Sequence, residues 1–118
     1  MANSPTSRSL EMLRKDGYVA DVIERWIPRA MIRKDWCGFG DILACGDENI
    51  ALIQTTTASN LMARWHKVVA NPAAEKWLNA GGEIFVHGWA KRGGRGERKL
   101  WQCDVRKIRL EDISSASA

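Results

Sequence analysis

The stretch Gly40–Thr57, GDILACGDENIALIQTTT, decides the expected fold, because it has the pattern of a β-hairpin with polar residues in both strands. Residues 41–45 and residues 50–57 have the apolar, β-branched character of strands. Residues 46–49, GDEN, are of the types that favour a tight turn. The sequence therefore predicts two antiparallel strands joined at residues 46–49.

The polar residues of this hairpin raise a chemical question. Side chains alternate faces along a strand, so Asp41 shares a face with Leu43, while Gln54 shares one with Leu52 and Thr56. A closed hairpin would bring Asp41 and Gln54 near each other, and a half-buried carboxylate is costly unless it is paired, hydrogen-bonded or bound to a cation. Two oxygen-bearing side chains at one place predict a site for a hard divalent ion such as Mg²⁺ or Mn²⁺.

The segment before the hairpin begins with a helix signal. Ser4-Pro5 is typical of an N-cap followed by proline at the first helical position, and Gly17 is the expected end of that helix. Residues 18–27 are rich in β-branched and aromatic residues and predict one strand, which Pro28 ends. The residues that follow, up to Gly40, are a connection or the start of the second strand.

After the hairpin the apolar period becomes helical. Residues 59–70 predict a helix, and Asn71-Pro72 either kinks it or caps a second short helix. Residues 83–90 and 99–110 alternate as two strands of a second hairpin. The order is helix, three strands, broken helix, two strands.

This order predicts an α/β fold with a mixed sheet of about five strands flanked by helices. At 118 residues the chain is expected to be a single domain, residues 1–118, with flexible tails at residues 1–4 and 111–118. No apolar run approaches the roughly 20 residues that cross a bilayer, and the N-terminus lacks a secretory signal pattern. Three cysteines without a CxxC pair suggest neither a disulfide framework nor a zinc site. The expected location is cytoplasmic, with no membrane partner.

The hairpin resembles a known active site. In element order and in the segment 38–57, the chain is similar to the PD-(D/E)XK nuclease superfamily, especially its Holliday-junction-resolvase-like, VRR-NUC and Mrr-like branches. Asp41 matches the metal-binding aspartate, and Gln54 matches the acidic position of the triplet, where the Mrr-like branch also shows glutamine. Glu11 and Glu24 are the nearest acids for the helical glutamate of the resolvase branch. The resemblance implies a restriction-endonuclease-like core, Mg²⁺ or Mn²⁺ as cofactor, and a possible homodimer.

The chain departs from the family at two positions of the triplet. Gln54 adds no negative charge, and Thr56 stands where the family has its lysine, which would orient water and offset developing charge. We expect Lys67 or Lys34 to supply the missing cation. The resemblance then implies catalytic roles for Asp41, Gln54, Thr56 and Lys67, and metal contacts for Asp41, Gln54 and Glu24.

The positive charge of the chain is concentrated in one loop. The net charge is +4, and residues 91–99, KRGGRGERK, hold five basic residues and one acid, a surplus of four that accounts for all of it. Glycines let such a backbone approach phosphates, and arginines contact them bidentately. Six basic residues are therefore predicted to contact DNA: Arg92, Arg95, Arg98, Lys99, Arg64 and Lys34. Most of the six tryptophans are expected in the core, with Trp36 the best candidate for an exposed ring that stacks on a base.

Three functions remain open from the sequence. The leading one is a metal-dependent endonuclease that hydrolyses phosphodiester bonds in branched, nicked or single-stranded DNA. The second is a nuclease fold without activity that serves as a nucleic-acid-binding module, and the third is a protein-interaction domain. In the simplest structural interpretation, Asp41 caps backbone amides and the basic loop is a solvated hairpin tip.

Overall fold

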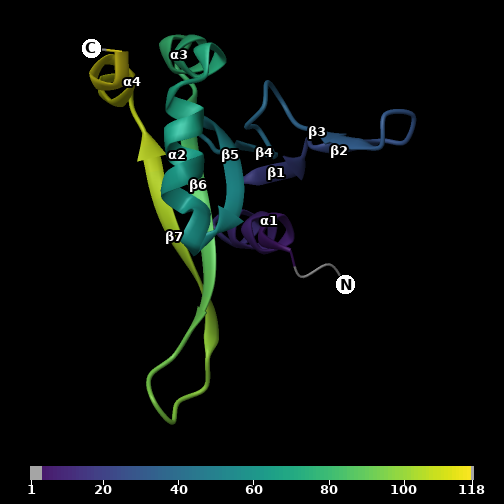
Figure 1. The fold of residues 1–118 in the computed structure, drawn as a ribbon, viewed down its shortest axis with the longest axis vertical. Coiled ribbons are helices and arrows are strands. Elements are labelled where there is room, and N and C mark those ends of the chain that lie inside the picture. The colour runs from purple at the N-terminus through teal and green to yellow at the C-terminus, as the bar shows by residue number, and fades with distance from the viewer. Residues whose placement is uncertain (1–3, 118) are drawn as a thin grey trace.

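The computed structural model describes residues 4–117, in which a mixed sheet carries helices on both faces and two hairpins project outward (Figure 1). No helix of this part of the chain combines the length and apolarity needed to cross a membrane. The elements in chain order are α1 Pro5–Lys15, β1 Val19–Val22, β2 Arg25–Ile27, β3 Ile32–Lys34, β4 Ile42–Cys45, β5 Ile50–Thr57, the 3₁₀ turn η1 Ala58–Asn60, α2 Leu61–Val69, α3 Pro72–Asn79, β6 Glu83–Arg92, β7 Leu100–Ile108 and α4 Leu110–Ser117.

The main sheet has five strands in the order β1-β4-β5-β6-β7. Neighbouring strands are antiparallel except β5 and β6, which are parallel. A parallel pair needs a crossover connection, and η1, α2 and α3 supply it. The predicted α/β class, with a mixed sheet of about five strands flanked by helices, is confirmed.

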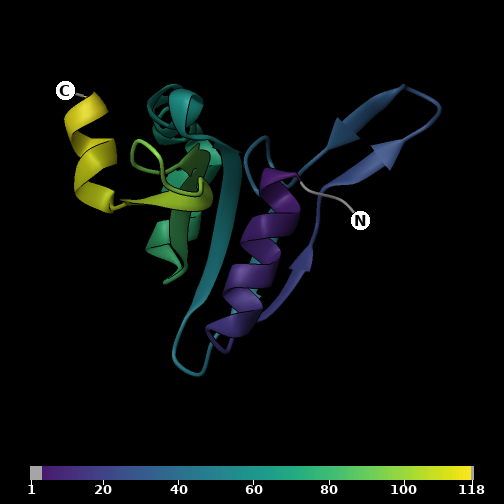
Figure 2. The same cartoon turned by 90° about the horizontal axis from the view of Figure 1, so that it is seen from below.

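The two faces of the sheet carry separate cores. Figure 2 shows α1 on one side of β5 and α4 on the other. Alternation along β5 sends Ile53 to the α1 face and Leu52 to the opposite face, which α2 covers. Because both faces of β5 are buried, residues 51–53 are apolar in succession rather than alternating with polar residues. Gln54 lies two residues after Leu52 in the strand, so its side chain leaves the backbone on the face that α2 covers.

Local signals set the helix ends as predicted. The Ser4 side chain accepts a hydrogen bond from the Ser7 N–H at 3.2 Å, with Pro5 at the first helical position of α1. Gly17 follows α1 with φ +96°, a conformation that other L-residues rarely adopt. Asn71 caps α3 through the Ala73 N–H at 2.9 Å, so the proline after Asn71 begins a second helix.

The single strand predicted over residues 18–27 is wrong. The N–H groups of Ile23 and Glu24 both donate to the Asp41 carbonyl, at 2.9 and 3.3 Å, which ends β1 and turns the chain away from the sheet. Residues 25–34 then form a separate antiparallel hairpin, β2–β3, which projects from the molecule (Figure 1). Residues 18–27 do have a high strand propensity, but propensity cannot distinguish one strand from two strands that belong to different sheets.

The tails also differ from the prediction. Residues 111–117, expected to be flexible, continue α4, and Ile113 is 6 % exposed in the core beneath α2 and α3. Ser4, expected in the flexible N-terminal tail, is the N-cap of α1. Residues 1–3 and 118 lie outside the described residues.

A glycine lets the crossover pack closely on β6. A Cβ at Gly88 would lie 2.8 Å from Leu61 Cδ1 and 3.0 Å from the Ala58 backbone. We expect Gly88→Ala to lower the free energy of unfolding by about 1–3 kcal/mol, because η1 and α2 must move to admit the methyl group. Urea denaturation measures this, and Gly94→Ala is a matched control, because a Cβ there would meet first the Glu97 carboxylate, the end of an exposed side chain that can move aside. An unchanged midpoint for Gly88→Ala would show that the crossover is not tightly packed there.

Candidate acidic site at the β4–β5 hairpin

Asp41 and Gln54 meet at the end of the β4–β5 pair. The Gln54 Nε2 donates to Asp41 Oδ2 at 2.7 Å, and the two residues are 3 % and 4 % exposed. The Asp41 N–H donates to the Ile53 carbonyl at 3.0 Å, which continues the ladder by one residue beyond β4. The approach predicted from the hairpin pattern is confirmed. The contact, however, is an amide N–H on a carboxylate and not two oxygens side by side.

Thr55 completes the surroundings of the Asp41 carboxylate. Its backbone N–H donates to Oδ2 at 2.9 Å, and its hydroxyl lies 3.3 Å from the same oxygen. The Thr55 hydroxyl also meets that of Thr6, on the first turn of α1, at 2.7 Å. Asp41 therefore does bind a backbone amide, as the simplest structural interpretation predicted, and α1 is tied to the site.

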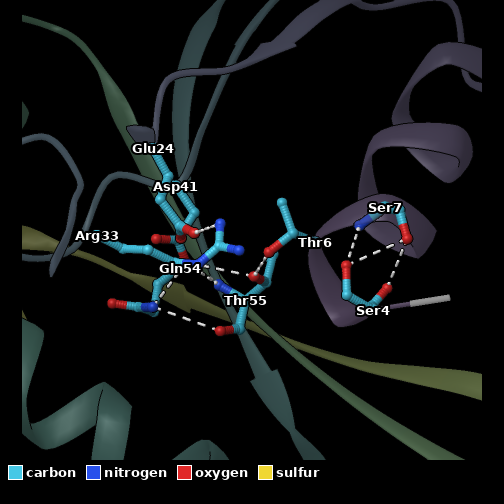
Figure 3. Close-up of polar contacts among 8 residues, drawn as sticks. All are labelled: Ser4, Thr6, Ser7, Glu24, Arg33, Asp41, Gln54 and Thr55. Carbon is cyan, nitrogen blue, oxygen red and sulfur yellow. Dashed lines mark hydrogen bonds and ion pairs between the residues drawn. The ribbon is translucent and has the colours of Figure 1, made fainter. Parts of the chain in front are cut away.

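Glu24 lies beside Asp41, although the two are separated by 16 residues in sequence. Its side chain is 20 % exposed, and its carboxylate accepts from the Arg33 Nη1 at 3.1 Å. Figure 3 shows the side chains of Glu24, Asp41, Gln54 and Arg33 gathered at one place, with Thr55 next to them. The chain thus brings two carboxylates, an amide and a guanidinium together at the base of the β2–β3 hairpin.

Burial raises the pKa of Asp41 to about 7, from an ordinary value of 3.8. The Thr55 N–H opposes this shift, while hydrogen bonding and charge repulsion from Glu24, together with the charge of Asp35, add to it. A carboxyl group with such a pKa is only half ionised near neutral pH unless a cation joins it. Strong perturbation by burial and a second carboxylate is typical of functional sites, though buried networks show it too.

The donor set fits a magnesium-like ion in part. Mg²⁺ takes one or two carboxylates and otherwise keeps water or phosphate oxygens, and Asp41 with Glu24 provides two. The Gln54 amide would add its oxygen only after rotating, since its nitrogen now faces Asp41. Among residues 4–117 no group of three or more His, Cys, Asp or Glu side chains converges as a metal site. Asp41, Glu24 and a rotated Gln54 are therefore the residues that would hold the ion.

Other residues predicted for the site lie apart from these contacts. Thr56 is 8 % exposed, pairs with Gly88 of β6, and carries no charge. Lys67 and Arg64 are exposed on α2. Lys34 is exposed on β3, where it lines a cavity of about 310 Å³. The expected rescue by Lys67 or Lys34 is thus not seen as a contact, whereas Arg33 makes one.

The basic loop lies at the tip of the projecting β6–β7 hairpin (Figure 1). Arg92 is bound bidentately by Asp104, at 2.9 and 2.7 Å, which raises the pKa of Arg92 and lowers that of Asp104. Arg98 and Lys99 line a cavity of about 510 Å³ with Lys91, and Arg95 is exposed. Of the predicted loop contacts, Arg92 is therefore already engaged within the protein.

Half of the tryptophans are not in the core. Trp26, Trp36 and Trp101 are 48 %, 40 % and 46 % exposed, so the expectation of a core position is wrong for Trp26 and Trp101. The first belongs to the uncovered β2–β3 hairpin, and Trp101 to the edge strand β7. The predicted exposure of Trp36 is confirmed, although its ring also packs edge-on against Phe39 and Trp77.

Sequence reasoning missed Arg33 and Thr55. Arg33 reaches Glu24 only because β3 folds back on β2, whereas the sequence pattern predicts a strand followed by a connection over these residues. The signal available was the pattern RWIPRAMIRK at 25–34, two short β-prone runs around Pro28. Thr55 was passed over because its backbone, which no sequence pattern marks, makes the shorter bond to Asp41.

Comparison with known proteins gives no relative: no protein-family model, no curated protein and no solved structure matches the chain.

The raised pKa of Asp41 predicts a pH dependence of stability in metal-free buffer. The folded state binds more protons than the unfolded state between pH 3.8 and about 7, so ionisation of Asp41 lowers the free energy of unfolding as pH rises through that window. Relative to Asp41→Asn, the wild type should lose about 2–4 kcal/mol between pH 4 and pH 7. The opposite effect of His87, whose pKa burial lowers to about 4, is common to both proteins and cancels.

Urea denaturation of both proteins at several pH values measures this difference. A constant difference across the window would show that Asp41 titrates normally.

Proposed function

We propose that this chain is a metal-dependent, nuclease-like phosphodiesterase that acts on DNA. One observation carries the proposal: the buried Asp41 carboxylate is bonded to Gln54 across the β4–β5 pair, with Glu24 beside it. Arg33 neutralises Glu24, but the hydrogen bonds that Asp41 accepts from Gln54 and Thr55 bring no positive charge, so burial opposes ionisation of Asp41 near pH 7. A divalent cation removes that conflict.

The order of elements supports the proposal. A helix, two antiparallel strand pairs β1–β4 and β4–β5, a helical crossover and the parallel strand β6 agree with the order that the PD-(D/E)XK resemblance implies. Gln54 lies within the third sheet strand, as the resemblance implies, while Asp41 stands one residue before the second strand rather than within it. Fold alone does not fix function, so the chemistry of the site has to carry the rest.

Each side chain has a definable role in phosphodiester hydrolysis. Asp41 and Glu24 supply negative charge toward a cation, and Gln54 supplies an amide oxygen once rotated. A divalent ion bound there would promote ionisation of water and offset charge on the phosphate. Thr55 and Thr6 hold the Asp41 carboxylate in place through the Thr55 N–H and the two hydroxyls.

In this proposal, Arg33 supplies the positive charge that the lysine of the family's triplet would provide. Thr56 offers no cation, but the Arg33 guanidinium binds the Glu24 carboxylate at 3.1 Å, at the rim of the site, with its side chain 70 % exposed. A guanidinium stays protonated, so it can bind a phosphate bidentately but cannot transfer a proton. We therefore assign Arg33 to phosphate positioning and charge stabilisation.

Purified protein incubated with branched, nicked, single-stranded and blunt duplex DNA tests the proposal. Cleavage is expected with Mn²⁺ or Mg²⁺ and none with EDTA. Arg33→Gln should slow cleavage by about 10- to 100-fold, less than the loss of a donor in a water-excluded site, because the Arg33 side chain is 70 % exposed. Arg29→Gln, a change of the same kind at an exposed position in the turn of the β2–β3 hairpin, is the control. Absence of cleavage on every substrate with either ion would reject the enzymatic proposal.

A second function is favoured by the polar contacts themselves. Oδ2 of Asp41 already accepts from Gln54 and Thr55, and the triplet lacks both its acid and its lysine, which suits a DNA-binding module without activity. Binding without cleavage would select it. Its affinity should fall steeply with salt, and Arg95→Gln should flatten that slope more than Arg92→Gln, because Asp104 already pairs with Arg92.

A further inference from the structure

Two surface cavities meet at one tryptophan on the α1 side of the β6–β7 hairpin. Their volumes are about 540 and 510 Å³, within the range of roughly 300–1,000 Å³ common for ligand sites. Trp101 lines both. The first cavity is further lined by Arg8, Glu11, Met12, Lys15 and Trp89, and the second by Lys91, Arg98, Lys99 and Leu100.

Trp101 is held in place although it is exposed. It lies on the edge strand β7 opposite Lys91 and keeps 46 % of its surface accessible. The Arg8 guanidinium carbon lies 3.7 Å from the ring centroid, a close cation–π contact. This contact limits the rotation of the exposed indole, so a planar ligand would meet an ordered ring.

The charge of the two cavities points to an anion. In the first, Glu11 forms an i,i+4 ion pair with Lys15 at 3.7 Å, so the one acid lining it has a basic neighbour. No acidic residue is among those lining the second cavity, which has three cations, Lys91, Arg98 and Lys99. A flat ring next to a row of cations is the combination that binds bases and phosphates of a single strand.

We propose that Trp101 and these two cavities bind a single-stranded segment of nucleic acid, with a base stacked on the indole and its phosphates on Lys91, Arg98 and Lys99. In a duplex the base faces are covered by their neighbours, so an exposed indole has no surface to stack on. This inference rests on the proposed function, because it assumes that the protein binds a polynucleotide. It adds that the substrate carries a single-stranded segment.

Helix α1 links this surface to the acidic site. Thr6, on its first turn, contacts Thr55 next to Asp41. Arg8, two residues later, makes the cation–π contact with Trp101. Ser9, which follows Arg8, is fully buried and is bonded by Trp89 at 2.8 Å and by His87 at 2.9 Å, which fixes α1 on β6. A nucleic-acid segment seated on Trp101 would therefore lie against the same helix whose first turn contacts the acidic site.

Fluorescence anisotropy with labelled oligo(dT) and with a blunt duplex tests the inference, in EDTA so that cleavage plays no part. Trp101→Leu should weaken oligo(dT) binding by roughly 5- to 100-fold and change duplex binding by less than about twofold. Trp101→Phe keeps an aromatic face and should stay within about threefold of wild type. Trp26→Leu is the matched control, because Trp26 is equally exposed on the other projecting hairpin.

A second measurement does not depend on the folding of any leucine variant. In ¹⁵N-labelled wild type, the indole N–H signal assigned through Trp101→Phe should shift on addition of oligo(dT), while that of Trp26 stays. An unshifted Trp101 signal would overturn the inference. So would a Trp101→Leu variant that binds oligo(dT) as the wild type does, or that loses duplex affinity to the same extent as oligo(dT) affinity. In each of these cases binding of the duplex by the wild type would still uphold the proposed function. Failure of the wild type to bind either DNA at low salt would overturn both.

Discussion

Asp41→Asn is expected to reduce Mn²⁺-dependent DNA cleavage by at least about 100-fold while leaving the fold intact. Asn keeps an oxygen for the Gln54 and Thr55 donors, and its NH₂ can donate to the Glu24 carboxylate. The substitution removes the negative charge of Asp41, one of the two carboxylates that would hold the cation. In metal-free buffer at pH 8 the variant should be at least as stable as the wild type, since an ionised buried carboxyl group is lost.

Asp47→Asn is the matched control for this experiment. Asp47 is exposed in the turn of the same hairpin, so the substitution makes the same change in net charge away from the site. It should leave cleavage within about twofold of wild type. Wild-type cleavage by Asp41→Asn, measured on the same DNA and with the same ion, would remove Asp41 from the mechanism.

Gln54→Glu is expected to make stability depend on a divalent ion. The substitution replaces an N–H donor 2.7 Å from Asp41 with a second oxygen, in a position that is 4 % exposed. Two carboxylates so close and so buried cannot both ionise, and the lost hydrogen bond leaves Asp41 with one donor fewer. In EDTA at pH 8 the free energy of unfolding should fall by about 2–4 kcal/mol.

Mn²⁺ should restore most of that loss, because three carboxylates then surround the ion. Thermal melts with and without Mn²⁺ measure the recovery. Gln102→Glu, at an exposed position on β7, makes the same chemical change and should melt as the wild type does in both buffers. Destabilisation of Gln54→Glu that no concentration of Mn²⁺ relieves would indicate a polar core contact rather than a cation site.

Much of the fold follows from local sequence. The turn at 46–49, the caps at Ser4 and Asn71 and the glycine after α1 are set by residues a few positions apart, which pattern reasoning can read. The meeting of Asp41 and Gln54 follows from the same hairpin register. Of the candidate site, the sequence thus correctly predicts the approach of Asp41 and Gln54.

The rest depends on contacts between distant segments. Glu24 and Arg33 join the site because the chain leaves the sheet after β1 and returns through a separate hairpin, a change that propensity does not encode. The buried trio Ser9, His87 and Trp89 spans 80 residues of sequence. Burial of α4 through Ile113 likewise requires the cover of α2 and α3, so residues 111–117 alone resemble a tail.

Calorimetric titration of Mn²⁺ into metal-free protein at pH 8 tests most directly whether Asp41, with Glu24 and Gln54, holds a divalent cation. The account predicts binding of one ion by the wild type and by Asp47→Asn, and its loss in Asp41→Asn. Equal binding by the wild type and Asp41→Asn, or no binding by the wild type in the presence or absence of DNA, would contradict it.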